Sequence, residues 1–299
     1  MSELWDVYSI DRKLKGKNCI RGEQGKLADD EFHLWVMVWI KNKNTGKYLV
    51  SQRCADKDID PLKWETVAGH AIAGETSLDA AIREVYEEVG ITLNPKEAKI
   101  LATKVATTID GHRHNWIRDS FYFETTEEPD LNKATTKEVI QTKWLSFSEI
   151  KEMYERGECC LNMGDIYGFE LNPIPSNQYQ DIIGKMVKGK IDRPLGTCHP
   201  RHKEMIYPIN YGYVSDIIGG DGQPQDIYLL CESSPVEEFS GKVIAVYHRY
   251  DDNETKWIVV PCDEKGNLKS NISIPDNDEI YALIAFQEQF FSGVLVGSK

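Results

Sequence analysis

The chain has 299 residues, 41% of them hydrophobic and 28% charged, a composition that excludes disordered and collagen-like proteins. Its length favours about two domains. The 48 acidic residues outnumber the 35 lysines and arginines, so the formal net charge is −13. A chain of this charge repels phosphate backbones, and we therefore expect no nucleic-acid partner.

The sequence gives no sign of membrane insertion or secretion. No basic region precedes an apolar stretch at its start, and the longest apolar run, residues 34–40, is far shorter than the roughly 20 residues of a membrane helix. The seven cysteines are scattered without CxxC spacing, which argues against a disulfide framework and a zinc site. We expect a cytoplasmic protein with reduced thiols and no membrane partner.

Residues 1–170 predict a mixed α/β domain. Alternating, β-branched and aromatic residues indicate strands, and amphipathic stretches indicate helices. The expected strands are 32–40, 48–53, 100–107, 116–125 and 140–145, and the expected helices are 76–89 and 146–156.

A second domain is expected after a boundary rich in proline and asparagine. Residues 172–177 form this boundary, and residues 178–187 predict a short connecting helix, so we place the linker at 171–187. Short apolar runs between turn-rich segments then indicate a small, mostly β barrel or sandwich at 188–299. The runs are 227–231, 243–247, 257–260 and 280–286.

The strongest chemical signal is a glycine-containing loop followed by an acidic helix, at residues 69–91. At about 100° per residue, Glu84, Glu87 and Glu88 share one sector of this helix, and its apolar residues share another, separate sector. The apolar residues are Leu78, Ile82, Val85 and Val89. Neighbouring carboxylates repel one another, and a hard cation such as Mg²⁺ compensates them while it keeps positions for water and phosphate. The pattern predicts metal-dependent phosphoryl transfer to water.

The residues around the acidic helix support the same kind of site. Gly69 and Gly74 allow close backbone approaches, and Thr76 followed by Asp79 resembles a capping box. Arg83 flanks Glu87 and either orients a carboxylate or contacts phosphate. We favour the orienting role.

Residues 69–91 resemble the Nudix box: Gly, five residues, Glu, seven residues, Arg-Glu-aliphatic, one residue, Glu-Glu, one residue, Gly-aliphatic. The resemblance implies an α/β/α sandwich around a mixed sheet. It also implies hydrolysis of a pyrophosphate bond in a nucleoside diphosphate linked to another moiety X, with Mg²⁺ or Mn²⁺ as the cofactor. Glu87 and Glu88 are then implied as metal ligands, Glu84 as a ligand or general base, and the Gly69 carbonyl as a further ligand. Glu84, Glu87 and Arg83 are the catalytic candidates.

Residues 32–34 and 64–70 are similar to type I isopentenyl-diphosphate isomerase, a Nudix relative that isomerises its substrate. His33 and His70 match two metal-binding histidines of that enzyme, and the alternative is that both are structural. Ala68 stands where the isomerase carries its catalytic cysteine, and a methyl group cannot transfer a proton. Isomerase activity is therefore a weaker alternative.

Residues 110–116 are expected to form a polar loop between two strands, where substrate-binding residues are common. His112 and His114 on this loop can supply a base or a phosphate contact, and His70 is a further candidate for substrate binding. An exposed hairpin tip is the alternative interpretation of the loop.

In the second domain, Asp221 and Asp226 on a glycine-rich turn are candidates for a phosphate or metal site. The alternative is a simple turn beside a tyrosine-rich core. The candidate partners of the two aspartates are Arg193, Tyr211 and Lys256.

The pattern of these residues resembles the core of the soluble family I inorganic pyrophosphatases. That family implies a small barrel that hydrolyses pyrophosphate with several Mg²⁺ ions, with Asp221 and Asp226 as metal ligands. Arg193, Tyr211 and Lys256 are implied as phosphate contacts. Gln223 stands where the family has an aspartate, and a neutral amide weakens the binding of dications. Pyrophosphatase activity is therefore left open beside a phosphate sensor and a structural or dimerisation module.

The sequence thus predicts a divalent-metal-dependent Nudix pyrophosphohydrolase with a pyrophosphatase-like barrel behind it. Its expected partner is a small-molecule nucleotide or diphosphate. A nucleotide-binding regulator with little turnover is the alternative, and a homodimer is an arrangement that the sequence allows.

Overall fold

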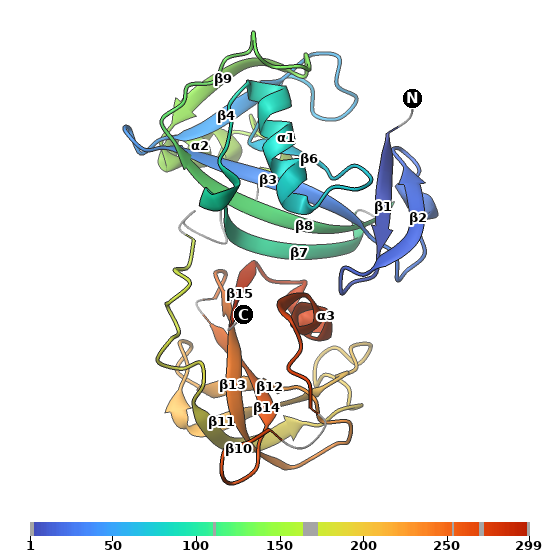
Figure 1. The fold of residues 1–299 in the computed structure, drawn as a ribbon, viewed down its shortest axis with the longest axis vertical. Coiled ribbons are helices and arrows are strands. Elements are labelled where there is room, and N and C mark those ends of the chain that lie inside the picture. Colours follow the sequence, from blue (N-terminus) through green and yellow to red (C-terminus); the bar gives the residue numbers. More distant parts are fainter. Residues whose placement is uncertain (1–2, 110–111, 164–172, 253, 269–271, 298–299) are drawn as a thin grey trace. The chain divides into compact units, whose positions relative to one another are not determined.

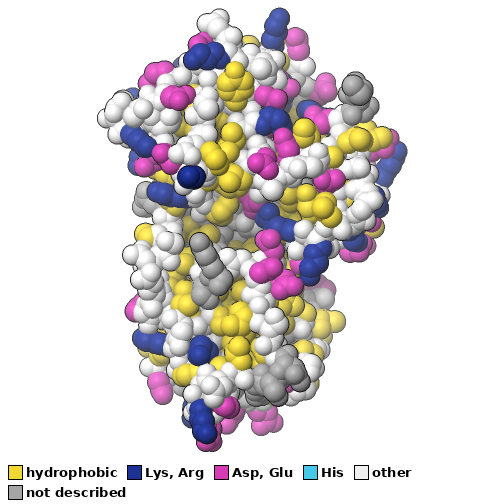
Figure 2. Space-filling model, in the orientation of Figure 1, with side chains coloured by type: hydrophobic (Ala, Val, Ile, Leu, Met, Phe, Trp, Pro, Cys, Tyr) yellow, Lys and Arg dark blue, Asp and Glu magenta, His cyan; other side chains and the backbone are white. Residues whose placement is uncertain are grey.

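The computed structural model describes residues 3–109, 112–163, 173–252, 254–268 and 272–297. It divides into two compact units, Met1–Pro173 and Ile174–Lys299 (Figure 1). Within the described ranges, no helix combines the length and the apolar character needed to cross a membrane. On the face drawn in Figure 2, acidic and basic side chains lie interspersed over both units.

A seven-stranded mixed sheet forms the centre of the first unit. Its strands, in spatial order, are β5 (Trp64–Glu65), β4 (Tyr48–Arg53), β3 (His33–Asn42), β8 (His112–Thr125) and β7 (Lys99–Ile109), with β6 (Val67–His70) paired to β3 and β9 (Val139–Leu145) paired to β4. Strands β3 and β8 are parallel, and the other pairs are antiparallel. All but two of the ten residues of β3 are buried, which explains its nearly continuous apolar sequence.

Two helices cover opposite faces of this sheet. Helix α1 (Ser77–Val89) lies on the face of Gly69, because a Cβ atom built on Gly69 would meet the side chain of Glu84 in that helix. Helix α2 (Phe147–Glu155) lies on the other face, where the Phe147 ring contacts the ring of Tyr48, 6.2 Å away. The α/β/α sandwich is therefore confirmed (Figure 1).

An N-terminal hairpin of β1 (Leu4–Tyr8) and β2 (Leu14–Ile20) was not predicted from the sequence. It forms a small core with Trp5, Val7, Cys19 and Leu27. Arg12, between its strands, donates two hydrogen bonds to the carboxylate of Asp119 in β8, the longer of them 2.8 Å. This ion pair attaches the hairpin to the central sheet.

The second unit is built on a closed barrel of five strands. The strands are β10 (Met186–Arg193), β11 (Asn210–Ile218), β12 (Pro224–Leu229), β14 (Thr255–Pro261) and β13 (Glu238–Arg249), and β10 pairs with β13 to close the ring. A further strand, β15 (Gly293–Gly297), pairs with β13. The expectation of a small, mostly β barrel is confirmed.

One apolar run of the second unit was assigned to the wrong kind of element. Residues 280–286 lie in helix α3 (Asn277–Glu288), not in a strand. Asp276 starts the helix through a capping box with Glu279, and this local signal decides between two elements that an apolar run alone does not separate.

The expected connecting helix at 178–187 is also wrong. Residues 176–184 form turns, β10 begins at Met186, and residues 171–172 of the expected linker lie outside the described ranges. The segment instead bonds to the barrel, because Gly184 N donates to Val243 O at 2.8 Å and Tyr179 Oη lies 2.6 Å from His248 Nδ1. Tertiary contacts with β13 thus replace the helical hydrogen bonds.

Candidate functional site

Helix α1 is held at both ends by its own sequence. Thr76 Oγ1 accepts a hydrogen bond from Asp79 N at 3.2 Å, and Thr76 N donates to Asp79 Oδ2 at 3.0 Å, which confirms the predicted capping box. The helix ends at Gly90, whose φ of 70° lies in the left-handed region that glycine tolerates. These two signals fix where the helix begins and ends.

The three glutamates of α1 do not form a separate, solvated face. Glu88 is buried at 5% exposure, and only 15% of the Glu84 side chain is exposed. The expected division into an apolar face and an acidic face is therefore wrong. The buried face of the helix includes a carboxylate among small and apolar residues: Ala80, Ala81, Val85, Glu88 and Val89.

Gly69 in β6 makes room for the carboxylate of Glu84. A Cβ atom on Gly69 would lie 2.1 Å from Cδ and from Oε1 of Glu84, so any larger residue would displace that side chain. The glycine thus brings a carboxylate directly against the backbone of a sheet strand.

Arg83 connects the loop before α1 with the glutamates of the helix. Its Nε and Nη2 donate to the two carboxylate oxygens of Glu75 at 2.7 and 3.0 Å, and Nη1 donates to Glu84 Oε1 and Glu87 Oε2, both at 2.9 Å. Nη2 also donates to the His70 carbonyl at 2.9 Å. Burial alone would lower the pKa of Arg83, but the hydrogen bonds and charges of Glu75 and Glu84 raise it. These contacts are those of a carboxylate-orienting residue.

Burial disfavours the charged form of Glu84 and Glu88, so each of these carboxylates needs a counter-charge to stay ionised. It raises the pKa of Glu84 to about 7, although Arg83 opposes the shift. It raises the pKa of Glu88 well above the ordinary value, and the charges of Glu65, Glu84 and Glu138 add to the effect. Glu88 Oε2 is buried and has no hydrogen-bond partner among the described residues.

Glu65 and Glu138 were missed by the sequence analysis. Glu65 is buried in β5 and forms an ion pair with Arg53 at 2.6 Å, and Glu138, just before β9, pairs with Lys57. No local motif marks either glutamate, because both reach α1 only through the pairing of β4 with β5 and β9.

The donor set suits a hard divalent cation. It consists of carboxylate oxygens with a buried, unpaired oxygen on Glu88, and oxygen is the ligand that Mg²⁺ and Mn²⁺ prefer. In the part of the chain that the structure describes, no group of three or more His, Cys, Asp and Glu side chains is arranged as a finished metal cage. Arg83 holds one oxygen of Glu84 and one of Glu87, so a cation would compete with it.

His33 and His70 pack against the indole of Trp5 from the N-terminal hairpin. Ring centroids are 4.6 Å apart for Trp5 and His33 and 4.2 Å apart for Trp5 and His70, with interplanar angles of 30° and 11°. Burial lowers the pKa of His70 well below its ordinary value, so its ring is neutral near pH 7. Stacked rings favour the structural interpretation of both histidines over that of metal ligands.

The same hairpin also contacts the loop before α1. Gly74 N donates to Asp6 Oδ2 at 2.7 Å, and Ala73 N donates to Leu4 O at 2.8 Å. The hairpin therefore holds a loop whose His70 carbonyl accepts from Arg83. No sequence signal connects residues 4–6 with this loop.

His112 and His114 belong to strand β8 instead of a loop. Ile109 of β7 pairs directly with His112, so the expected loop at 110–116 is wrong for residues 112–116, and residues 110–111 lie outside the described ranges. The side chains of both histidines also lie outside the described part of the structure, and their candidate role is untested.

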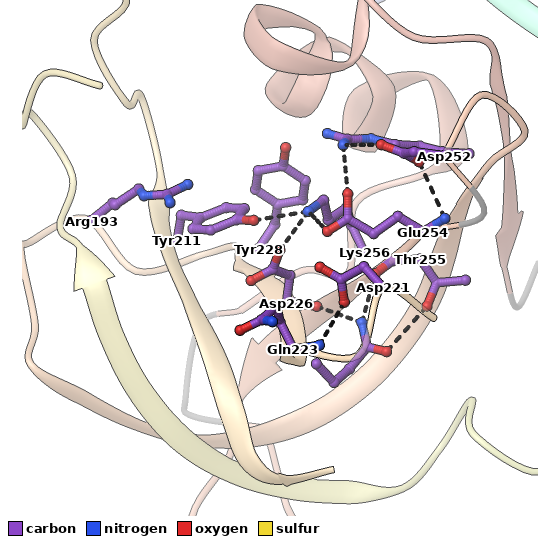
Figure 3. Close-up of polar contacts among 12 residues, drawn as sticks. Arg193, Tyr211, Asp221, Gln223, Asp226, Tyr228, Asp252, Glu254, Thr255 and Lys256 are labelled. Carbon is purple, nitrogen blue, oxygen red and sulfur yellow. Dashed lines mark hydrogen bonds and ion pairs between the residues drawn. The ribbon is translucent and has the colours of Figure 1, made fainter. Parts of the chain in front are cut away.

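In the barrel, the structure brings four of the five candidate residues together (Figure 3). Lys256 Nζ lies 3.0 Å from Tyr211 Oη and also donates to Asp226 and Glu254. The Arg193 guanidinium lies 4.8 Å from the centroid of the Tyr211 ring. Asp221 is drawn beside this cluster in Figure 3, but it is exposed, and its Oδ1 accepts from the backbone N of Gln223 at 3.0 Å.

Arg249 and Glu288 extend this cluster and were missed by the sequence analysis. Arg249 donates to both carboxylate oxygens of Glu288 at 2.7 Å and to Glu254 at 2.7 Å. Burial would raise the pKa of Asp226, but Lys256 outweighs it and lowers that pKa, whereas burial prevails at Glu254 and raises its pKa. The barrel site is a network of ion pairs in which Arg249, Lys256 and Glu288 are buried and Asp226 and Glu254 are partly buried.

Comparisons with known proteins recognise both units. Residues 31–159 match the family model of the NUDIX domain, and residues 184–295 match that of inorganic pyrophosphatase. An uncharacterized Nudix hydrolase of Listeria monocytogenes is 35% identical over 159 residues, covering 52% of this chain and 87% of that protein. Nudix hydrolase 3 of Arabidopsis thaliana is 32% identical over 173 residues, or 56% of this chain and 22% of that protein.

An isopentenyl-diphosphate Delta-isomerase of Escherichia coli is 30% identical over 125 residues, which span 41% of this chain and 66% of that enzyme. A crystal structure from Deinococcus radiodurans superposes with a TM-score of 0.42 at 18% identity, covering 53% of this chain and 92% of that one. The Listeria relative is matched over 87% of its length at 35% identity, and the isomerase over 66% of its length at 30% identity. The chain belongs to the Nudix hydrolase family, and its Nudix domain is followed by a C-terminal inorganic pyrophosphatase domain.

Proposed function

We propose that the Nudix domain hydrolyses a pyrophosphate bond in a nucleoside diphosphate linked to another moiety X, with Mg²⁺ or Mn²⁺ held at α1. The observation that carries this proposal is the buried carboxylate of Glu88, whose Oε2 has no hydrogen-bond partner among the described residues. An unpaired buried carboxylate is costly, and a bound dication removes that cost.

Glu87, Glu88 and the Gly69 carbonyl are the residues that we assign to the cation. When bound, a dication supplies an activated water molecule and neutralises charge on the phosphate oxygens. Arg83 orients the carboxylates, since it holds one oxygen each of Glu84 and Glu87 and both oxygens of Glu75. This fixed geometry lowers the entropy cost of placing water against phosphorus.

Glu84 is our candidate for the general base. Burial raises its pKa to about 7, and a base with a pKa near the working pH is the most effective. Arg83 holds Oε1 of Glu84, so we assign the proton taken from the attacking water to Oε2.

Two alternatives remain to be weighed against hydrolysis. Isomerase chemistry requires a proton-transferring group where this chain has Ala68, and the histidines that match isomerase ligands are stacked on Trp5. A nucleotide-binding regulator would bind the same ligands with little turnover. The orientation of three carboxylates by Arg83 favours the hydrolase over the regulator.

The test is a panel of nucleoside triphosphates, nucleotide sugars and dinucleoside polyphosphates with the full chain and Mg²⁺ or Mn²⁺. Glu88→Gln keeps the shape of the side chain and removes its charge, so we expect a loss of turnover on the order of 10³-fold, or ~4 kcal/mol. Glu152→Gln in α2, whose side chain is 67% exposed, is the matched control and should keep full activity. Equal rates in the two variants would refute the assigned site, and nucleotide binding without cleavage across the panel would favour the regulator.

A further inference from the structure

The pyrophosphatase-type barrel carries two buried cations among the carboxylates of its candidate site. The family resemblance implies Lys256 as a phosphate contact, whereas it implies no role for Arg249. The Lys256 side chain is 3% exposed, and its ammonium contacts Tyr211, Asp226 and Glu254. The Arg249 side chain is also 3% exposed and contacts Glu254 and Glu288. Figure 3 shows the ammonium of Lys256 between Tyr211, Asp226 and Glu254.

The carboxylates of Asp226, Glu254 and Glu288 are each already paired with a cation of the chain. Asp226 pairs with Lys256, Glu254 pairs with both Lys256 and Arg249, and Glu288 accepts from Arg249 and from Tyr228 Oη. Arg249 also pairs with the more exposed Asp252 at 3.3 Å. Two fixed positive charges therefore compensate half of the charge of these four carboxylates, which weakens their attraction for several dications.

The remaining candidate ligands do not restore a metal site. Asp221 is exposed, and one of its oxygens accepts from the backbone of its own turn, at Gln223 N. Gln223 contributes a neutral amide in place of a carboxylate. The residues present therefore do not fit the ions that the family implies.

A metal ion bound to Glu254 and Glu288 would have to displace the guanidinium of Arg249. Taking one partner away from a buried ion pair is strongly destabilising, because the other charge is left unpaired in a low-dielectric site. Arg249 donates to both glutamates at once, so the entering ion would have to break both pairs.

We propose that the barrel of this chain is a metal-independent module that does not hydrolyse pyrophosphate, with Arg249 as a built-in counter-charge to carboxylates that the family's divalent cations would otherwise neutralise. Pyrophosphate presented to the protein is then left intact. The barrel also needs no divalent ion for its folding.

The direct test uses the full-length Glu88→Gln protein, in which the proposed metal site of the Nudix domain is disabled. We expect no orthophosphate release from pyrophosphate with Mg²⁺, and no bound Mn²⁺ that depends on Asp226 in equilibrium dialysis. Orthophosphate release that disappears in a further Asp226→Asn variant would overturn the proposal. Bound Mn²⁺ that persists after Asp226→Asn would belong to the Nudix domain and would count against the proposed function instead.

A second variant tests the counter-charge itself. Arg249→Met on the Glu88→Gln background removes the guanidinium and leaves Glu254 and Glu288 without it. We expect this protein to gain Mn²⁺ binding and a rise in melting temperature with Mn²⁺ that its parent does not show. A folded Arg249→Met protein that gains neither would overturn the proposal. If Arg249→Met does not fold, the measurements on the unmodified barrel still decide the proposal.

Discussion

Glu88→Gln should make the metal-free protein more stable while it abolishes its response to metal. The buried Oε2 of Glu88 lacks a partner among the described residues, and an unsatisfied buried polar group costs about 1–3 kcal/mol. A glutamine of the same shape carries no charge. We therefore expect the free energy of unfolding in EDTA to rise by about 1–3 kcal/mol in mildly alkaline buffer, measured by urea denaturation.

The pH dependence gives the sign of this effect. Burial raises the pKa of Glu88 in the folded state above the ordinary value of 4.5. The folded protein therefore binds more protons, and its stability falls as the pH rises from 4.5 through the folded-state pKa. The advantage of Glu88→Gln should be largest above that pKa and should vanish below pH 4.5, where the carboxyl group is protonated in both states.

Metal should reverse the ranking of the two proteins. A cation present at a hundred times its dissociation constant stabilises its binding protein by about 2.7 kcal/mol. Wild-type protein should gain this increment with Mg²⁺, and Glu88→Gln should gain none. Glu152→Gln should behave as wild type in every condition. A metal-free Glu88→Gln protein less stable than wild type, or one still stabilised by Mg²⁺, would refute the reasoning.

Three further predictions concern Gly69, Glu84 and the hairpin. Gly69→Ala should displace Glu84, and we expect kcat to fall by about 10²-fold and the free energy of unfolding by about 1–3 kcal/mol. Gly25→Ala is the control and should change neither, because a Cβ atom there meets nothing within 4 Å. At low metal concentration, kcat/KM should rise with pH through about 7 as Glu84 loses its proton. If Glu84→Gln shows the same rise in kcat/KM, Glu84 is not the general base. Arg12→Met should leave Asp119 buried and unpaired and cost about 3–5 kcal/mol in urea denaturation, and adding Asp119→Asn should recover part of that loss.

Local signals in the sequence predicted the helix and its motif well. The capping box of Thr76, the glycine at the end of α1 and the alternation in β3 and β4 all depend on residues close together in the chain. The predicted orientation of carboxylates by Arg83 is likewise short-range, since its partners lie one to thirteen residues away.

The features that could not be predicted depend on contacts between distant residues. A helical wheel places Glu88 beside Glu84, but its burial follows from the packing of α1 on the sheet. The Arg12 and Asp119 ion pair spans 107 residues, and the Arg249 and Glu288 pair spans 39. In the barrel, composition shows aspartates and a lysine, but only the closed sheet shows that they neutralise one another.

The N-terminal hairpin has a practical consequence for anyone who isolates the catalytic unit. The recognised Nudix segment starts at residue 31, yet Trp5, Asp6 and Arg12 contact its histidines, its glycine loop and its buried Asp119. A fragment that begins at residue 31 would lack the Trp5 indole that stacks on His33 and His70. It would also leave the buried carboxylate of Asp119 without Arg12. The segment recognised by sequence similarity therefore begins later in the chain than the segment that folds as one unit. An expression fragment should keep the whole folding unit, including the N-terminal hairpin.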